Sequence, residues 1–128
     1  MEPDAAFWEA LTQLLLSTPI IIDRPKGTQH PCYRDLIYPR DYGYVENTIS
    51  SDASGIDVWF GSLNTVTDNR RAKTLTGILC TFDTLKRDAE TKLLIGCSHD
   101  DIRIIRDFLK DMWTLYIPNP MVDNDLSN

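Results

Sequence analysis

The chain has 128 residues and a formal net charge of −6, with 42% hydrophobic and 25% charged residues. This is the mixture of one ordinary globular domain that needs no disulfide or metal to fold. The acidic balance argues against nucleic acid or an anionic membrane as the main partner, since both attract clustered lysine and arginine.

No apolar run approaches the roughly 18 residues that a membrane-spanning helix needs. The N-terminus, Met1-Glu2-Pro3-Asp4, is acidic and lacks the basic start of a signal peptide. We therefore expect a cytoplasmic protein without a membrane partner.

The first half of the chain predicts one helix, a short strand and a long irregular segment. Apolar residues at helical spacing predict a helix over residues 4–16, and a Ser-Thr-Pro stretch over 17–19 ends it. Residues 20–22, three consecutive isoleucines, predict a buried strand. Residues 24–41 are punctuated by three prolines, and the only strand expected there is a short one over 36–38. A loop of this length inside a compact domain is typically functional.

The second half predicts more strands and one further helix. The expected strands, all short and rich in apolar or β-branched residues, are 42–45, 56–63, 75–82 and 91–97. Residues 64–73 are expected to form an exposed hairpin loop, and 83–90 the turn of a second hairpin. Ser98 begins the clearest helix, with Asp101 as its capping-box partner. Its apolar stripe is Ile102, Ile105, Leu109 and Met112.

This order of elements predicts one mainly β, α+β domain over residues 1–117, followed by a flexible tail over 118–128. Strands that follow one another through hairpins favour an antiparallel sheet or a small barrel of about five or six strands. The two helices are expected to pack outside it.

The cysteines and histidines do not suggest a metal centre. Cys32, Cys80 and Cys97 never form a C-x-x-C motif, and His30 and His99 are too few and too separated to complete a zinc site. We expect free and mostly buried thiols.

Two acidic residues flank a short turn, in the stretch Asp52-Ala53-Ser54-Gly55-Ile56-Asp57. Two carboxylates placed this way can face one hard cation such as Mg²⁺, which takes one or two carboxylates and completes its shell with waters and phosphate oxygens. The same stretch also fits ordinary turn chemistry, with Asp52 capping the turn and Asp57 exposed on a strand.

A second charged stretch places Asp83, Asp88, Glu90 and Lys92 around one hairpin. A lysine beside metal-binding carboxylates suits a phosphate whose charge the metal does not fully neutralise. A solvated hairpin tip also explains this stretch.

A third stretch places Tyr38 and Tyr42 on either side of a proline turn. Their hydroxyls could donate to an anion or to carboxylates. Buried aromatic packing is the plainer explanation.

Together these stretches resemble a known enzyme family. The order Pro25-Lys26-Gly27-Thr28, Tyr38-Pro39-x-x-Tyr42-Gly43-Tyr44, Asp52 with Asp57, and Asp83 with Asp88 and a nearby lysine is similar to that of the family I soluble inorganic pyrophosphatases. The resemblance covers about residues 20–97. It implies an oligonucleotide-binding-type (OB-like) barrel whose acidic rim holds Mg²⁺ around pyrophosphate, with attack by a metal-bridged hydroxide.

The resemblance also implies cofactor, substrate and site residues. The cofactor would be Mg²⁺, with Mn²⁺ as a substitute, the substrate pyrophosphate or a small diphosphate, and the chain would self-associate into a homo-oligomer. Metal ligands are implied at Asp52, Asp57, Asp83 and either Asp88 or Glu90, and phosphate contacts from Lys26, Tyr42, Lys92 and Lys110. Asp52, Asp57 and Ser54 would form the catalytic set.

Ser54 stands where the family has its general base, the central acid of D-x-D-x-x-D. A serine hydroxyl cannot accept a proton from water near neutral pH. The sequence therefore leaves two readings open. One is a Mg²⁺-dependent hydrolase, and the other is a weakened or inactive relative that binds metal and anion or a partner protein. An oligonucleotide-binding module would need a basic groove, which the acidic balance disfavours.

Overall fold

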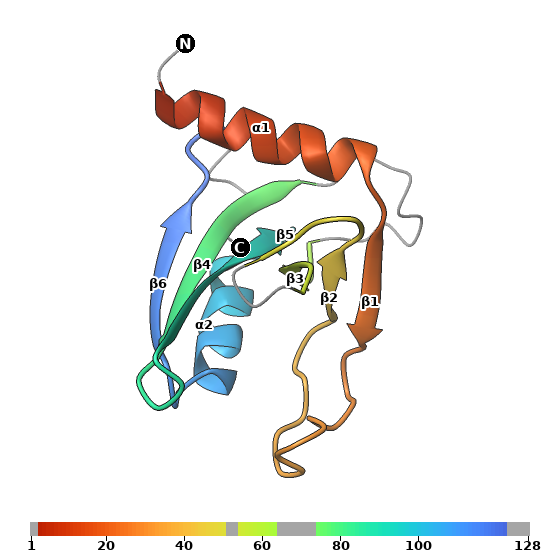
Figure 1. Ribbon diagram of the computed structural model, residues 1–128, viewed down its shortest axis with the longest axis vertical. Helices are drawn as coiled ribbons and strands as arrows, with labels where there is room; N and C mark the ends of the chain where they lie inside the picture. Colours follow the sequence, from red (N-terminus) through yellow and green to blue (C-terminus); the bar gives the residue numbers. More distant parts are fainter. Residues whose placement is uncertain (1–2, 51–53, 64–73, 123–128) are drawn as a thin grey trace.

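The computed structural model describes residues 3–50, 54–63 and 74–122, shown in Figure 1. The elements, in chain order, are α1 (Pro3–Ser17), β1 (Ile20–Arg24), β2 (Tyr42–Val45), β3 (Ile56–Phe60), β4 (Leu75–Asp83), β5 (Asp88–Ile95), α2 (His99–Phe108) and β6 (Trp113–Pro118). Neither of these helices is long and apolar enough to cross a membrane.

All six strands form one sheet in the order β1-β2-β3-β5-β4-β6. The mainly β, α+β class is confirmed, and the arrangement is consistent with a small OB-like barrel. Two details of the expectation are wrong. The β3–β5 pair is parallel, because the β4–β5 hairpin inserts β5 between β3 and β4. Within the described residues the sheet is also not closed into a full barrel.

The two helices pack against opposite faces of the sheet. Successive side chains of a strand point to opposite faces, and both faces are apolar in the middle of the sheet. One face packs against Trp8 and Leu15 of α1, through Ile20, Val45, Val58, Phe60, Leu75, Ile78, Leu93 and Ile95. The other packs against Ile102, Ile105 and Leu109 at α2, through Tyr38, Trp59, Leu79, Leu94 and Cys97. Figure 1 shows α1 lying across one end of the strands.

The capping box that the sequence predicts for α2 is confirmed. The Ser98 hydroxyl accepts from the backbone N–H of Asp101 at 3.1 Å, and the Asp101 carboxylate accepts from the backbone N–H of Ser98 at 2.8 Å. The apolar stripe holds as far as Leu109, which is buried. Met112 follows the helix and packs against the same cluster.

The strand β6 was not predicted, and the expected tail begins too early. β6 pairs antiparallel with β4 up to Pro118. Asn119 is buried; its backbone N–H donates to the Thr76 carbonyl at 2.9 Å and its side-chain amide to the Leu75 carbonyl at 2.8 Å. The fold therefore includes Pro118 and Asn119, while residues 123–128 lie outside the described part.

The segment between β1 and β2 folds back on itself. Gly27 donates to the Tyr38 carbonyl at 2.8 Å, and Tyr38 donates to the Thr28 carbonyl at 2.9 Å. The short strand expected over 36–38 is reduced to an isolated bridge between Gln29 and Ile37. The hairpin loop expected over 64–73 lies outside the described residues.

The three cysteines are free, as expected. Burial holds only in part, since Cys97 is buried, Cys80 is half-buried and Cys32 is exposed. Burial raises the pKa of the Cys97 thiol, so it stays protonated and behaves as a core residue.

Candidate functional site

Four of the predicted site residues meet on the sheet face that α2 covers. They are Tyr42 of β2, Asp57 of β3, and Glu90 and Lys92 of β5, and we call them the Lys92 cluster. The Lys92 Nζ donates to the Tyr42 hydroxyl at 3.0 Å, to Asp57 Oδ2 at 3.1 Å and to Glu90 Oε2 at 3.0 Å. One ammonium therefore joins groups from three strands.

The strand register explains why these four residues meet. The parallel β3–β5 pairing sets Val58 beside Leu93, which places the preceding residues, Asp57 and Lys92, next to each other on the opposite face. Glu90 lies two residues before Lys92 and so shares that face. The parallel β3–β5 pair, which the sequence did not predict, brings these residues together.

Burial and charge make the cluster a fixed polar centre. Lys92 is only 6% exposed. Burial alone would lower the pKa of Lys92, but the facing Tyr42 and Asp57, with Glu90, outweigh it and raise that pKa. Burial likewise raises the pKa of Tyr42, so its hydroxyl keeps its proton. With both acids ionised, two carboxylates face one ammonium, and the cluster carries an excess negative charge.

Aromatic rings form the wall between the cluster and the core. The Tyr42 ring lies 4.6 Å from that of Trp59, and the Tyr38 ring lies 5.0 Å from that of Phe108 at the end of α2, measured between centroids. Tyr38 is buried, so aromatic packing accounts for its position. Tyr42 has two roles, with its ring in the wall and its hydroxyl in the cluster.

Asp83 and Asp88 face each other at the β4–β5 hairpin, farther along the face that holds Glu90. One oxygen of Asp83 accepts from the backbone N–H groups of Leu85 and Lys86, at 2.9 and 3.1 Å, and so caps the turn. Of the two acids left open by the sequence, Glu90 and not Asp88 lies against Lys92. Metal binding by Asp83 and Asp88 stays a prediction.

The remaining predicted residues are not among the groups bonded to Lys92, or they lie outside the described residues. Asp52 is outside the described residues. Ser54 is exposed in the turn before β3. Lys26 is exposed, with its backbone N–H bonded to Asp41 at 2.8 Å, and Lys110 is exposed beyond the end of α2. In the described part of the chain neither lysine is hydrogen-bonded or ion-paired to the cluster.

A second polar centre, around Asp101, is structural. Asp101 is fully buried. Its Oδ1 accepts from Arg40 Nε, and its Oδ2 from the backbone N–H and hydroxyl of Ser62 and the backbone N–H of Ser98, each at 2.8 Å. Burial alone would raise the pKa of Asp101, but these donors lower it. The sequence predicted only the capping role and gave no signal for Arg40 or Ser62.

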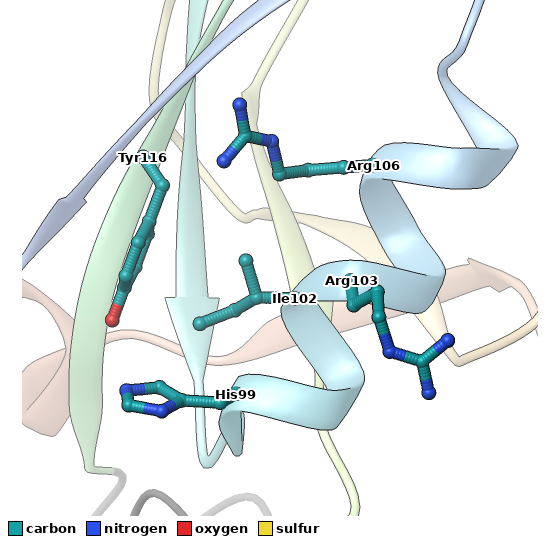
Figure 2. A pocket seen from close by; sticks show the side chains of 5 residues that line it. All are labelled: His99, Ile102, Arg103, Arg106 and Tyr116. Carbon is teal, nitrogen blue, oxygen red and sulfur yellow. The ribbon is translucent and has the colours of Figure 1, made fainter.

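An open hollow of about 500 Å³ lies between α2 and β6 (Figure 2), lined by His99, Ile102, Arg103, Arg106 and Tyr116. In the picture Arg103 points away from Tyr116. Arg106 donates to the Thr114 hydroxyl at 3.0 Å, which ties α2 to β6. The hollow shares no residue with the Lys92 cluster and is separate from it.

The described residues contain no group of three or more histidine, cysteine or acidic side chains placed to hold a metal ion. Asp57 and Glu90 are two carboxylates that both contact Lys92, at 3.1 and 3.0 Å.

Comparisons with known proteins show the fold. No family profile matches the chain, and no curated protein matches it either. Among solved structures, an inorganic pyrophosphatase from Coxiella burnetii aligns with a TM-score of 0.51 at 16% identity, over 79% of this chain and 82% of that one. An inorganic phosphatase from Anaplasma phagocytophilum gives 0.48 at 15% identity, over 77% and 81%. The inorganic pyrophosphatase of Helicobacter pylori gives 0.44 at 16%, over 85% of each chain.

The chain has a pyrophosphatase-like fold. At 16% identity this likeness concerns the fold alone, and function has to be argued from the site.

Proposed function

We propose that this chain is a short, divergent relative of the family I inorganic pyrophosphatases, which hydrolyses pyrophosphate or a related small diphosphate with Mg²⁺, or Mn²⁺ in its place. The observation that carries the proposal is the Lys92 cluster, where Tyr42, Asp57 and Glu90 converge on one ammonium. The fold shared with the Coxiella enzyme supports the same reading.

The residues of the cluster fit a hard divalent cation. Asp57 and Glu90 offer carboxylate oxygens and together carry more charge than Lys92 neutralises. Their side chains are 20% and 16% exposed, so solvent reaches both. Mg²⁺ needs only one or two carboxylates when waters and phosphate supply its other ligands. When bound, the ion would supply Lewis-acid polarisation of phosphate and a lowered pKa for water.

The chain's own donors would position the diphosphate. Lys92 would supply a positive charge and Tyr42 a hydroxyl, and the Tyr42 ring is packed against Trp59. Donors in a partly buried site stabilise developing negative charge more strongly than donors in water do. Asp57 accepts a hydrogen bond from Lys92 in the structure and would offer a ligand oxygen to the cation.

Ser54 sets an upper limit on the rate. A general base typically contributes on the order of 10²–10⁴-fold, and serine cannot fill that role. The missing acid at Ser54 is the observation in favour of a second candidate function. In that case the chain is a weakened or inactive pyrophosphatase-like protein that binds metal and anion, or a protein partner, without useful turnover.

Phosphate release from pyrophosphate with millimolar Mg²⁺ or Mn²⁺ tests the proposal. We expect the wild-type rate to exceed background and Asp57→Asn to lower it at least about tenfold, the loss typical even for an outer partner of a metal ligand. Asp107→Asn, which removes an exposed acid of α2, should stay within about twofold of wild type, the scatter expected of a remote surface change. Background rates in both the wild type and Asp57→Asn would end the hydrolase proposal and leave the binding alternative.

A further inference from the structure

The hydrogen bonds of Lys92 are already complete. An ammonium has three N–H donors, and Lys92 directs them to Tyr42, Asp57 and Glu90, all within 3.1 Å. No donor is left for a phosphate oxygen while these bonds stand. A site built to receive an anion through Lys92 is therefore closed in this arrangement.

The ammonium also takes the position that a cation would need. It lies within 3.1 Å of both carboxylates, Asp57 and Glu90. A cation that shares those oxygens must compete with the charge already there. Lysine can yield, because its charge sits on a flexible four-carbon stem that can turn while the backbone of β5 stays fixed.

We infer that Lys92 is an internal counter-ion that a divalent cation displaces from Asp57 and Glu90, and that the displaced ammonium then becomes the donor to the phosphate. The inference rests on the proposed function and adds its regulation. The cation binds against a competitor, and its binding creates the anion site. A diphosphate without a cation finds Lys92 occupied.

Direct Mn²⁺ binding without any anion, measured by titration calorimetry, tests the competition. Lys92→Met removes the competitor and should bind Mn²⁺ on the order of tenfold more tightly than wild type, within the range of ordinary coupling between sites. Lys92→Arg keeps the charge and should bind as wild type does. Lys86→Met removes an exposed lysine of the same hairpin and should change the affinity less than about twofold. Unchanged or weaker Mn²⁺ binding in Lys92→Met overturns the inference.

The second half of the exchange is measured with inorganic phosphate at saturating Mn²⁺. Here Lys92→Met should bind phosphate on the order of tenfold more weakly than wild type. One substitution would thus strengthen cation binding and weaken anion binding, whereas the loss of a merely structural lysine would weaken both. Phosphate binding equal to that of wild type contradicts the donor role.

A measurement on the wild type covers the case in which Lys92→Met does not fold. Acylation of lysines, followed by mass spectrometry, should label Lys92 more slowly than exposed Lys86 without ions, severalfold faster once Mn²⁺ is added, and slowly again with phosphate. Labelling of Lys92 that Mn²⁺ leaves unchanged overturns the inference. If wild type hydrolyses pyrophosphate but Lys92 never moves, only this inference fails. If no variant binds Mn²⁺, the proposed function fails with it.

Discussion

Lys92 is the residue whose contacts decide what the site can do. The sequence predicts it together with Tyr42 and Asp57, because short motifs can keep their spacing while the rest of the sequence diverges. It could not choose between Glu90 and Asp88, since both lie on the same face of β5 and the choice depends on which of them Lys92 contacts. Nor could it see that Asp83 caps its own turn, because a local hydrogen bond and a metal ligand use the same carboxylate.

Ser54 offers a gain-of-function prediction. Ser54→Asp restores an acid at the general-base position and should raise phosphate release by about tenfold or more, within the range of such groups. The rate of phosphate release at saturating Mg²⁺ measures it. The same change in the Asp57→Asn background should give no gain. If Ser54→Asp alone gives none, the site departs from the family pattern beyond this one residue.

Asp101 offers a stability prediction. Removing one partner of a buried ion pair costs about 3–5 kcal/mol, so Asp101→Ala should lose that much at pH 7, measured by urea unfolding. The exposed Asp107→Ala serves as the control and should lose less than about 0.5 kcal/mol.

The same carboxylate gives a pH dependence. The pKa of Asp101 is lowered in the folded state, below the value of about 3.9 expected unfolded. The contribution of Asp101 to the free energy of unfolding is therefore complete above that pH. It is lost as the pH falls through the lowered pKa of the folded state. The difference in the free energy of unfolding between wild type and Asp101→Ala should therefore become smaller only at acidic pH. A gap that instead narrows between pH 6 and 9 would contradict this assignment.

At the scale of elements, the sequence predicts features that lie within one helix, but it does not predict which strands pair with each other. The α2 capping box and apolar stripe are contained within one helix, so the sequence alone predicts them. The sequence did not predict β6, because its apolar residues directly follow a helical pattern. Two of them, Trp113 and Leu115, are exposed in the structure. The parallel β3–β5 pair depends on how β4 and β5 insert into the sheet, which no local pattern encodes.

The end of β6 gives a prediction at this scale. Asn119→Ala removes the hydrogen bond to the Leu75 carbonyl and the one accepted from the backbone N–H of Met121 at 2.9 Å. Leaving such buried groups unpaired costs about 1–3 kcal/mol. The loss should appear in the free energy of unfolding, while Met121→Ala, at a side chain that is 66% exposed, should change it by less than about 0.5 kcal/mol. Equal losses of unfolding free energy in Asn119→Ala and Met121→Ala would mean that the fold ends at Pro118.

At the scale of the whole molecule, one sheet face carries both an apolar core and the Lys92 cluster. Under α2 that face is apolar, and beyond Trp59 it becomes the polar Lys92 cluster. The rings of Trp59 and Tyr42 pack behind the site, while the carboxylates of Asp57 and Glu90 stay partly exposed. Under the proposed function, the net charge of −6 fits an anion that binds together with cations and not through a basic surface.

A cation that binds the folded chain should also stabilise it. By mass action, Mg²⁺ at a hundred times its dissociation constant adds about 2.7 kcal/mol to the free energy of unfolding, and the melting temperature should rise accordingly. Asp107→Asn should keep the rise and Asp57→Asn should lose it. A rise that NaCl of equal ionic strength reproduces would point to general screening instead of a site.

A crystal grown with Mn²⁺ and imidodiphosphate, a diphosphate analogue that resists hydrolysis, tests the central claim most directly. We predict anomalous density for Mn²⁺ against the carboxylates of Asp57 and Glu90, with the analogue beside Tyr42 and Lys92. Mn²⁺ bound elsewhere, or an unchanged Lys92 cluster with neither ion nor analogue near it, would contradict the account.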